Sequence, residues 1–125
     1  MNPEPLAREK IITTMKLANP HWKRCTILCG KEVEEFFKGS KNLALLQKVA
    51  FYILAYVENT VDFVFDLLEA RSEERARRYL EFMKPSIERL RKLYREVHKT
   101  KNAKKANALI HKMISICLDI GLDPF

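Results

Sequence analysis

The chain has 125 residues, of which 47% are hydrophobic and 31% are charged, with only three glycines and five prolines. This length and composition are typical of one globular domain and exclude a disordered or fibrous chain. The net charge is +7, and the excess lies in residues 71–125, which carry fourteen Lys and Arg against seven Asp and Glu. Many Lys, Arg and Glu residues beside a single glutamine, Gln47, are a composition typical of thermophiles.

The apolar segments are too short for a membrane protein. The most apolar run, residues 49–57, has nine residues, whereas a transmembrane helix needs about twenty. The first sixteen residues are mixed in charge and lack the uninterrupted apolar stretch of a signal peptide. We therefore expect a cytoplasmic protein that does not associate with a membrane.

Capping residues and prolines divide the first half of the chain into three predicted helices. The first covers residues 3–18, because Pro3 suits a first helical position and Pro20 ends the segment. The second covers about residues 21–38 and ends at Gly39. The third, about residues 41–70, is the longest and most apolar, so we expect it to be the central helix of a bundle.

The second half predicts two or three further helices. Ser72 can cap a short charged helix to about residue 83, and Pro85 should break or kink it before a helix that reaches residue 98. A last helix, about residues 103–120, ends at Gly121. No segment alternates with a period of two, so no sheet is expected. The prediction is a single all-α domain over residues 1–125, an irregular bundle of five or six helices with a long central apolar helix.

Carboxylates form a stripe on the predicted central helix. At about 100° per residue, Glu58, Asp62, Asp66 and Glu69 fall within roughly 80° of one another. Because the rest of this stretch is apolar and must be buried, the acids lie on a narrow strip where they repel each other. Either Lys and Arg side chains from the second half or a divalent cation such as Mg²⁺ can compensate this charge, and the residues alone leave both open.

The preceding helix offers a second acidic pair, Glu32 and Glu35, about 60° apart by the same geometry. If the two helices pack antiparallel through their apolar faces, this pair approaches Glu58 and Asp62. The result would be a carboxylate cluster built from two helices. The plain alternative is a solvated acidic surface, which is what most charged helix faces are.

The segment Glu32-Val33-Glu34-Glu35, followed after 22 residues by Glu58-Asn59-Thr60-Val61-Asp62, resembles the signature of the all-α nucleoside triphosphate pyrophosphatases, the MazG-like group. In that family an E-x-x-E pair on one helix and an E-x-x-D pair on the next hold Mg²⁺. The resemblance implies Mg²⁺-dependent hydrolysis of a nucleoside triphosphate to the monophosphate and pyrophosphate. It also implies a homo-oligomer.

The match is incomplete. Glu32, Glu35 and Asp62 fit the family pattern, but Asn59 stands where the second pair has its Glu, so Glu58 would have to substitute, with Asp66 as a further ligand. This departure puts the activity in doubt, and the enzyme is expected to be either active or degenerate. Residues 101–105 are similar to a basic stretch that meets the phosphates in the family, and the expected phosphate contacts are Lys31, Lys101, Asn102 and Lys105.

A different function follows from the basic second half. It favours a non-catalytic helical module that binds nucleic acid or an acidic protein partner. No helix-turn-helix or zinc-finger motif accompanies the charge, and no Ser-His-Asp arrangement or Gly-rich phosphate loop supports another kind of catalysis. Steep salt dependence of binding to DNA or RNA would favour the module, and nucleotide turnover would favour the enzyme.

Overall fold

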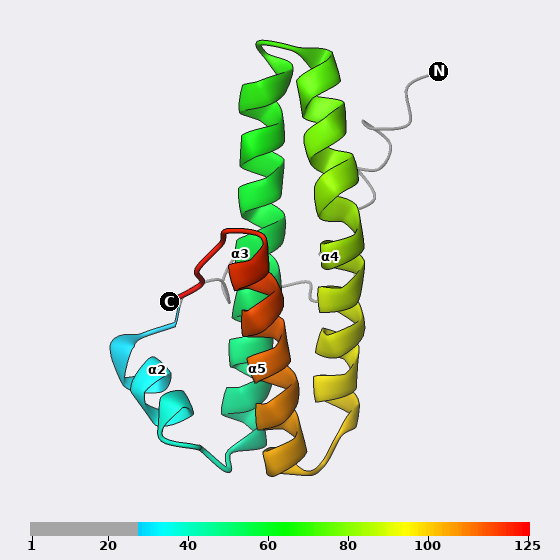
Figure 1. The fold of residues 1–125 in the computed structure, drawn as a ribbon. Helices are drawn as coiled ribbons and strands as arrows, with labels where there is room; N and C mark the ends of the chain where they lie inside the picture. The colour runs from blue at the N-terminus through cyan, green and yellow to red at the C-terminus, as the bar shows by residue number, and fades with distance from the viewer. Residues whose placement is uncertain (1–27) are drawn as a thin grey trace.

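The structure is a computed structural model that describes residues 28–125, and these residues form four helices and no strand. The helices are α2 (Gly30–Phe37), α3 (Leu43–Glu69), α4 (Glu73–Lys99) and α5 (Ala103–Asp119). Figure 1 shows α3 and α4 as a long antiparallel pair, with α5 lying along their lower half and the short α2 beside the lower part of α3. The all-α class is confirmed.

Helix α3 is the central helix, as its apolar sequence predicts, because it contacts α2, α4 and α5. Asn42 caps its first turn, with Oδ1 accepting hydrogen bonds from the backbone N–H groups of Ala44 (3.0 Å) and Leu45 (3.3 Å). Twelve of its residues are buried, and Glu58 is the one charged residue among them. Its buried face meets those of α4 and α5 in one continuous core.

Helix α4 corrects the prediction of two helices separated at Pro85, because it runs unbroken from Glu73 to Lys99 with Pro85 inside it. A proline inside a helix loses one backbone hydrogen bond and costs about 3 kcal/mol. Here the ring is exposed, while buried residues continue on both sides of it, at Leu80, Met83 and Ile87. Burial of this continuous apolar stripe against α3 offsets the local cost.

The second predicted helix is also corrected at its start. Cys29 has an extended backbone (φ −78°, ψ 159°) and precedes the first residue of α2, so no helix runs through it. The helix predicted at residues 3–18 lies outside the described residues. With the two expected helices of residues 72–98 joined in α4, the described part of the chain has four helices where the sequence predicted five or six for the whole.

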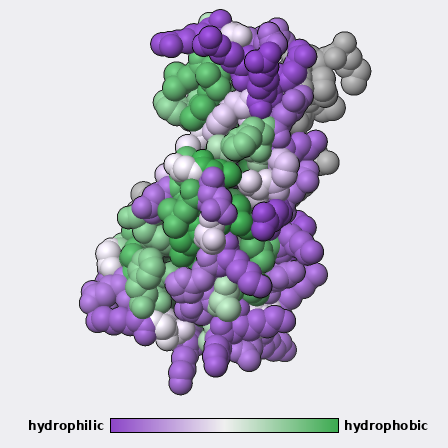
Figure 2. All heavy atoms as spheres, viewed as in Figure 1, coloured by the Kyte–Doolittle hydropathy of each residue, from purple (hydrophilic) through white to green (hydrophobic). Residues whose placement is uncertain are grey.

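The C-terminal residues return to the side of α3 near α2. The Tyr52 hydroxyl donates a hydrogen bond to the Pro124 carbonyl oxygen (2.5 Å), and the Phe125 ring lies 5.7 Å from the Tyr52 ring. In Figure 2 hydrophobic side chains lie mainly in the middle of this view, and hydrophilic side chains cover both its upper and its lower end. Among the described helices, none is long and apolar enough to cross a membrane.

Candidate functional site

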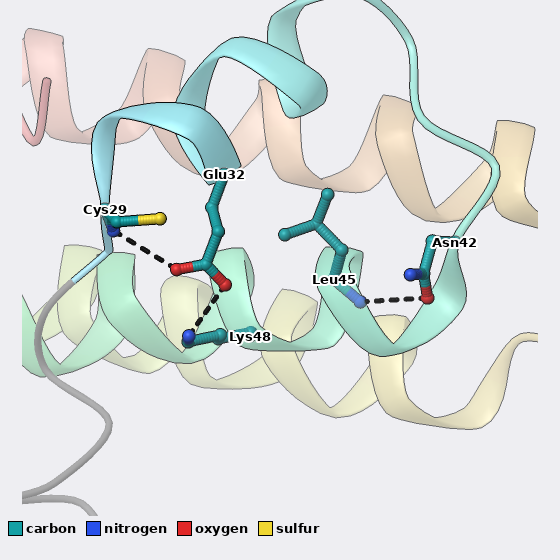
Figure 3. A network of polar contacts seen from close by, with 5 residues as sticks. All are labelled: Cys29, Glu32, Asn42, Leu45 and Lys48. Carbon is teal, nitrogen blue, oxygen red and sulfur yellow. Dashed lines mark hydrogen bonds and ion pairs between the residues drawn. The ribbon is translucent and has the colours of Figure 1, made fainter.

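The first predicted metal ligand, Glu32, is held by a lysine from the neighbouring helix (Figure 3). Its Oε2 lies 2.7 Å from the Lys48 Nζ, and its Oε1 accepts a hydrogen bond from the Cys29 backbone N–H at 3.1 Å. The hydrogen bonds from Lys48 and Cys29 lower the pKa of Glu32 from 4.5 to about 2. This carboxylate therefore caps α2 and ties α2 to α3.

The second predicted ligand, Glu58, is buried between α3 and α4. Its Oε1 accepts a hydrogen bond from the Arg91 Nε at 2.8 Å, and the Glu58 side chain has no exposed surface. The other oxygen, Oε2, is buried without a hydrogen-bond partner. Burial raises the pKa of Glu58 above its usual range, and the hydrogen bond and charge of Arg91 act against this rise.

The structure does not bring the predicted carboxylates together. Lys48, which binds Glu32, precedes Glu58 by ten residues on the same helix, which is about 15 Å along its axis. Glu35 and Asp66 are exposed, and Asp62 is half-buried. Across residues 28–125, no three His, Cys, Asp or Glu side chains are close enough to hold a metal ion.

These carboxylates do not fit a shared Mg²⁺ site in this arrangement. A magnesium site needs carboxylate oxygens that converge on one point, whereas Glu32 and Glu58 are each neutralised by a cation of the protein. The sequence left open whether Lys and Arg of the second half or a divalent cation compensates the stripe on α3, and for Glu58 the compensating cation is Arg91. The Mg²⁺-dependent activity stays a prediction.

The predicted phosphate contacts lie in two places. Lys31 is an exposed residue of the first turn of α2. Lys101, Asn102 and Lys105 are exposed where α5 begins, and Asn102 caps that helix, with Oδ1 accepting a hydrogen bond from the Lys105 backbone N–H at 3.1 Å. Asn102 therefore has a structural role besides the predicted one.

Lysines gather at the lower end of the bundle, where α3 begins, α4 ends and α5 begins (Figure 1). Neither residues 36–57 nor residues 97–118 contain any Asp or Glu. We name the lysines of these two segments the lysine pole: Lys38, Lys41, Lys48, Lys99, Lys101, Lys104, Lys105 and Lys112.

Most of the lysine pole is open to solvent. Lys38 and Lys48 form ion pairs with Glu34 and Glu32. The other six lysines are all exposed. By contrast, residues 58–81, which lie toward the opposite end, carry seven Asp and Glu against four Arg. Within residues 28–125 most of the exposed lysines therefore gather at one end of the bundle, where Glu32, Glu34 and Glu96 also lie.

A cavity of about 740 Å³ opens within the lysine pole. It lies between the turn that precedes α3, at residues 39–41, and the first turns of α5, at residues 102–111. Gly39 takes a left-handed conformation in that turn (φ 85°), which glycine adopts without strain. The turn brings Lys41 to the same cavity as Lys104.

Sequence reasoning missed the lysine pole because it counted charge by halves of the chain. The basic half contains Arg71, Arg75, Arg77 and Arg78, which lie near the α3–α4 turn at the other end of the bundle (Figure 1). It omits Lys38, Lys41 and Lys48, of which Lys41 lines the same cavity as the first residues of α5. The signal was the absence of acids from residues 36–57 and 97–118.

No family model matches the chain, and the comparisons with curated proteins and with solved structures likewise found no match.

Proposed function

We propose that the protein is a non-catalytic helical module that binds the phosphate backbone of a nucleic acid through the lysine pole. The observation that carries this proposal is the concentration of eight lysines in two segments without a single Asp or Glu. Phosphates along a nucleic acid strand attract such a surface, and each neutralised phosphate releases counterions. A surface of this kind needs no sequence-specific motif.

The nature of the surface favours a nucleic acid over an acidic protein. The centre of a protein–protein interface is formed by large apolar and aromatic side chains. Of the large apolar side chains in residues 36–57 and 97–118, only Phe37 and Leu118 are exposed. Lys41 and Lys104 line a cavity together with Gly, Ser, Asn and Ala residues, which suit contacts with phosphate and sugar.

The state of the acidic residues favours binding over catalysis. A metal-dependent pyrophosphohydrolase would need Glu32 and Glu58 as ligands. Both are engaged in ion pairs, and Glu58 has no surface from which it can meet a substrate. Hydrolysis by this chain would therefore require both ion pairs to break.

The decisive experiment compares two double variants with equal charge changes at opposite ends of the molecule. In the variant Lys101→Glu/Lys105→Glu, Lys101 directly precedes Asn102, the residue that caps α5. Lys105 is the residue whose backbone N–H donates to the Asn102 side chain. Arg71→Glu/Arg75→Glu changes the two corresponding residues at α4, where Ser72 is the cap. In each pair the second change places Glu in the first turn of a helix, where a negative charge is favourable. Both variants should therefore fold.

Fluorescence anisotropy with a labelled 20-base-pair DNA duplex measures the affinity between 50 and 200 mM salt. If about four phosphates are neutralised, the affinity falls roughly 100-fold over this range. The variant in the lysine pole should lower the slope of log K against log salt by about 1.8 and weaken binding at least tenfold. The variant at the α3–α4 turn should stay within about threefold of wild type, because only long-range charge changes.

Equal loss of affinity in the two variants would show that net charge, and not the lysine pole, governs binding. Absence of salt-dependent binding in the wild type would refute the proposed function. Circular dichroism of each variant checks that its helix content is that of wild type.

A further inference from the structure

The cavity in the lysine pole has the size and lining of a small-molecule site. Its volume of about 740 Å³ lies within the range of about 300–1,000 Å³ that is usual for such sites. Gly39, Ala103 and Ala108 give it a floor without bulky side chains, so a flat ring can approach the backbone. None of the residues that line it is acidic.

Polar groups stand around this apolar floor. Ser40 and Asn107 line the cavity and offer a hydroxyl and an amide, which together can donate and accept hydrogen bonds. Asn102 uses its amide oxygen to cap α5, and its amide NH₂ group remains as a donor. An apolar floor with two amides and a hydroxyl at its edge suits a nucleobase, which has flat apolar faces and polar edges.

An aromatic ring is already fixed at the cavity. His111 lines it and is exposed, and its ring stacks on that of buried Phe36 with centroids 5.4 Å apart and planes 27° apart. Phe36 packs against the imidazole, and His111 keeps exposed surface at the cavity that a second ring can contact. Stacking of a base on a held aromatic side chain contributes about 1–3 kcal/mol, which is about 5- to 150-fold in affinity.

The cavity is flanked by charges that match phosphates. Lys41 lines it from the α3 side and Lys104 from the α5 side. Beyond them the exposed lysines of the pole continue at Lys99, Lys101 and Lys105. A free nucleotide would leave those more distant lysines unused, whereas a strand that continues on both sides of the cavity meets them.

We infer that the cavity takes one unstacked base of single-stranded nucleic acid, stacked on His111, while Lys41 and Lys104 bind the neighbouring phosphates. This inference rests on the proposed function and narrows it, because a duplex keeps its bases stacked and can use only the lysines. The protein should bind a single strand more tightly than a duplex of similar length.

The test uses a labelled twelve-nucleotide oligothymidylate and the labelled 20-base-pair duplex at one salt concentration. Ala108→Leu fills the cavity without changing charge, and His111→Ala removes the stacking ring. Ala44→Leu is the matched control, since Ala44 is also an exposed helical alanine near the pole but does not line the cavity. All three positions are exposed, but His111 also stacks on buried Phe36, so circular dichroism checks that His111→Ala keeps the helix content of wild type.

Ala108→Leu and His111→Ala should each weaken oligothymidylate binding by at least fivefold and leave duplex binding within twofold. Ala44→Leu should change neither. If the single strand and the duplex bind equally and Ala108→Leu affects neither, the cavity inference is wrong and the lysine pole remains as a general phosphate-binding surface. If neither nucleic acid binds, the proposed function falls and this inference with it.

Discussion

The buried ion pair between Glu58 and Arg91 provides the sharpest test of the packing of α3 against α4. The Glu58 side chain has no exposed surface and the Arg91 side chain is 12% exposed. Arg91→Met keeps much of the aliphatic stem but leaves the carboxylate without its cation. Removal of one partner of a buried pair typically costs about 3–5 kcal/mol, so we expect a loss of that size at pH 7.

Two further variants distinguish the loss of the attraction between Glu58 and Arg91 from the cost of leaving one of them buried without its partner. Glu58→Leu should cost less than Arg91→Met, because the partly exposed Arg91 can reach water with its charged end. The double variant Glu58→Leu/Arg91→Met removes both charges, and its stability should lie within about 2 kcal/mol of wild type or above it. Urea denaturation followed by circular dichroism at pH 7 measures all three values.

The cost of Arg91→Met should depend on pH. Burial raises the folded-state pKa of Glu58, so the folded protein holds this proton more tightly than the unfolded chain does. Protonation of Glu58 then favours the folded state. The stability that Glu58 contributes is lost as the pH rises from the pKa of Glu58 in the unfolded chain toward its raised pKa in the folded protein. Without Arg91 this loss should grow. A cost below about 1 kcal/mol at pH 7, or one that is equal at pH 5 and pH 8, would refute this account of the pair.

Three further outcomes follow from the described contacts. Glu32→Gln should lower stability by no more than about 1 kcal/mol, because the pair with Lys48 is partly exposed. Since the pKa of Glu32 is lowered to about 2, the stability that this carboxylate contributes is present above about pH 4.5 and is lost as the pH falls toward 2. The stabilities of wild type and Glu32→Gln should therefore converge in acid denaturation curves. Gly121→Ala should lower the stability measured in urea titrations by about 1 kcal/mol, because Gly121 has a φ of 78°, which alanine adopts only with strain. An added Cβ meets no neighbour at Gly121 or at Gly30, so the control Gly30→Ala, which lacks the positive φ, should cost nothing. Incubation with nucleoside triphosphates and Mg²⁺ should release no pyrophosphate, and release that Asp62→Asn abolishes would restore the hydrolase hypothesis.

The helices with strong end signals could be predicted from the sequence to within about two residues. Residues 103–120 were expected and α5 covers Ala103–Asp119, since Asn102 and Gly121 mark its two ends. The central helix was expected at residues 41–70 and covers Leu43–Glu69. Its cap is Asn42, which lies one residue after the predicted start.

The errors in the fold have tertiary causes. Pro85 is a strong local signal for a break, but the apolar stripe on both sides of it packs on α3 and keeps one helix. The prediction of one helix over residues 21–38 missed the start of α2, for which Cys29 is the cap. The spacing of Cys29 and Glu32 could have revealed it, because a Glu three residues after a cap accepts a hydrogen bond from the backbone there.

The acidic stripe shows what helical geometry alone leaves undetermined. The helical rotation of about 100° per residue correctly places Glu58 and Asp62 on one side of α3. It cannot say which neighbour faces that side, and Arg91 is 33 residues further along the chain. Because α4 covers Glu58, the stripe is divided into a buried acid with an arginine partner and acids nearer the surface.

The separation of charge along the bundle gives residues 28–125 an electric dipole moment along the bundle axis. Residues 58–81, with three more acids than bases, lie toward one end, and eight lysines lie at the other. The field of an approaching polyanion exerts a torque on such a molecule and turns its basic end forward before contact. A larger share of collisions is then productive than if the charges of residues 28–125 were spread evenly, and added salt should slow association by screening this alignment.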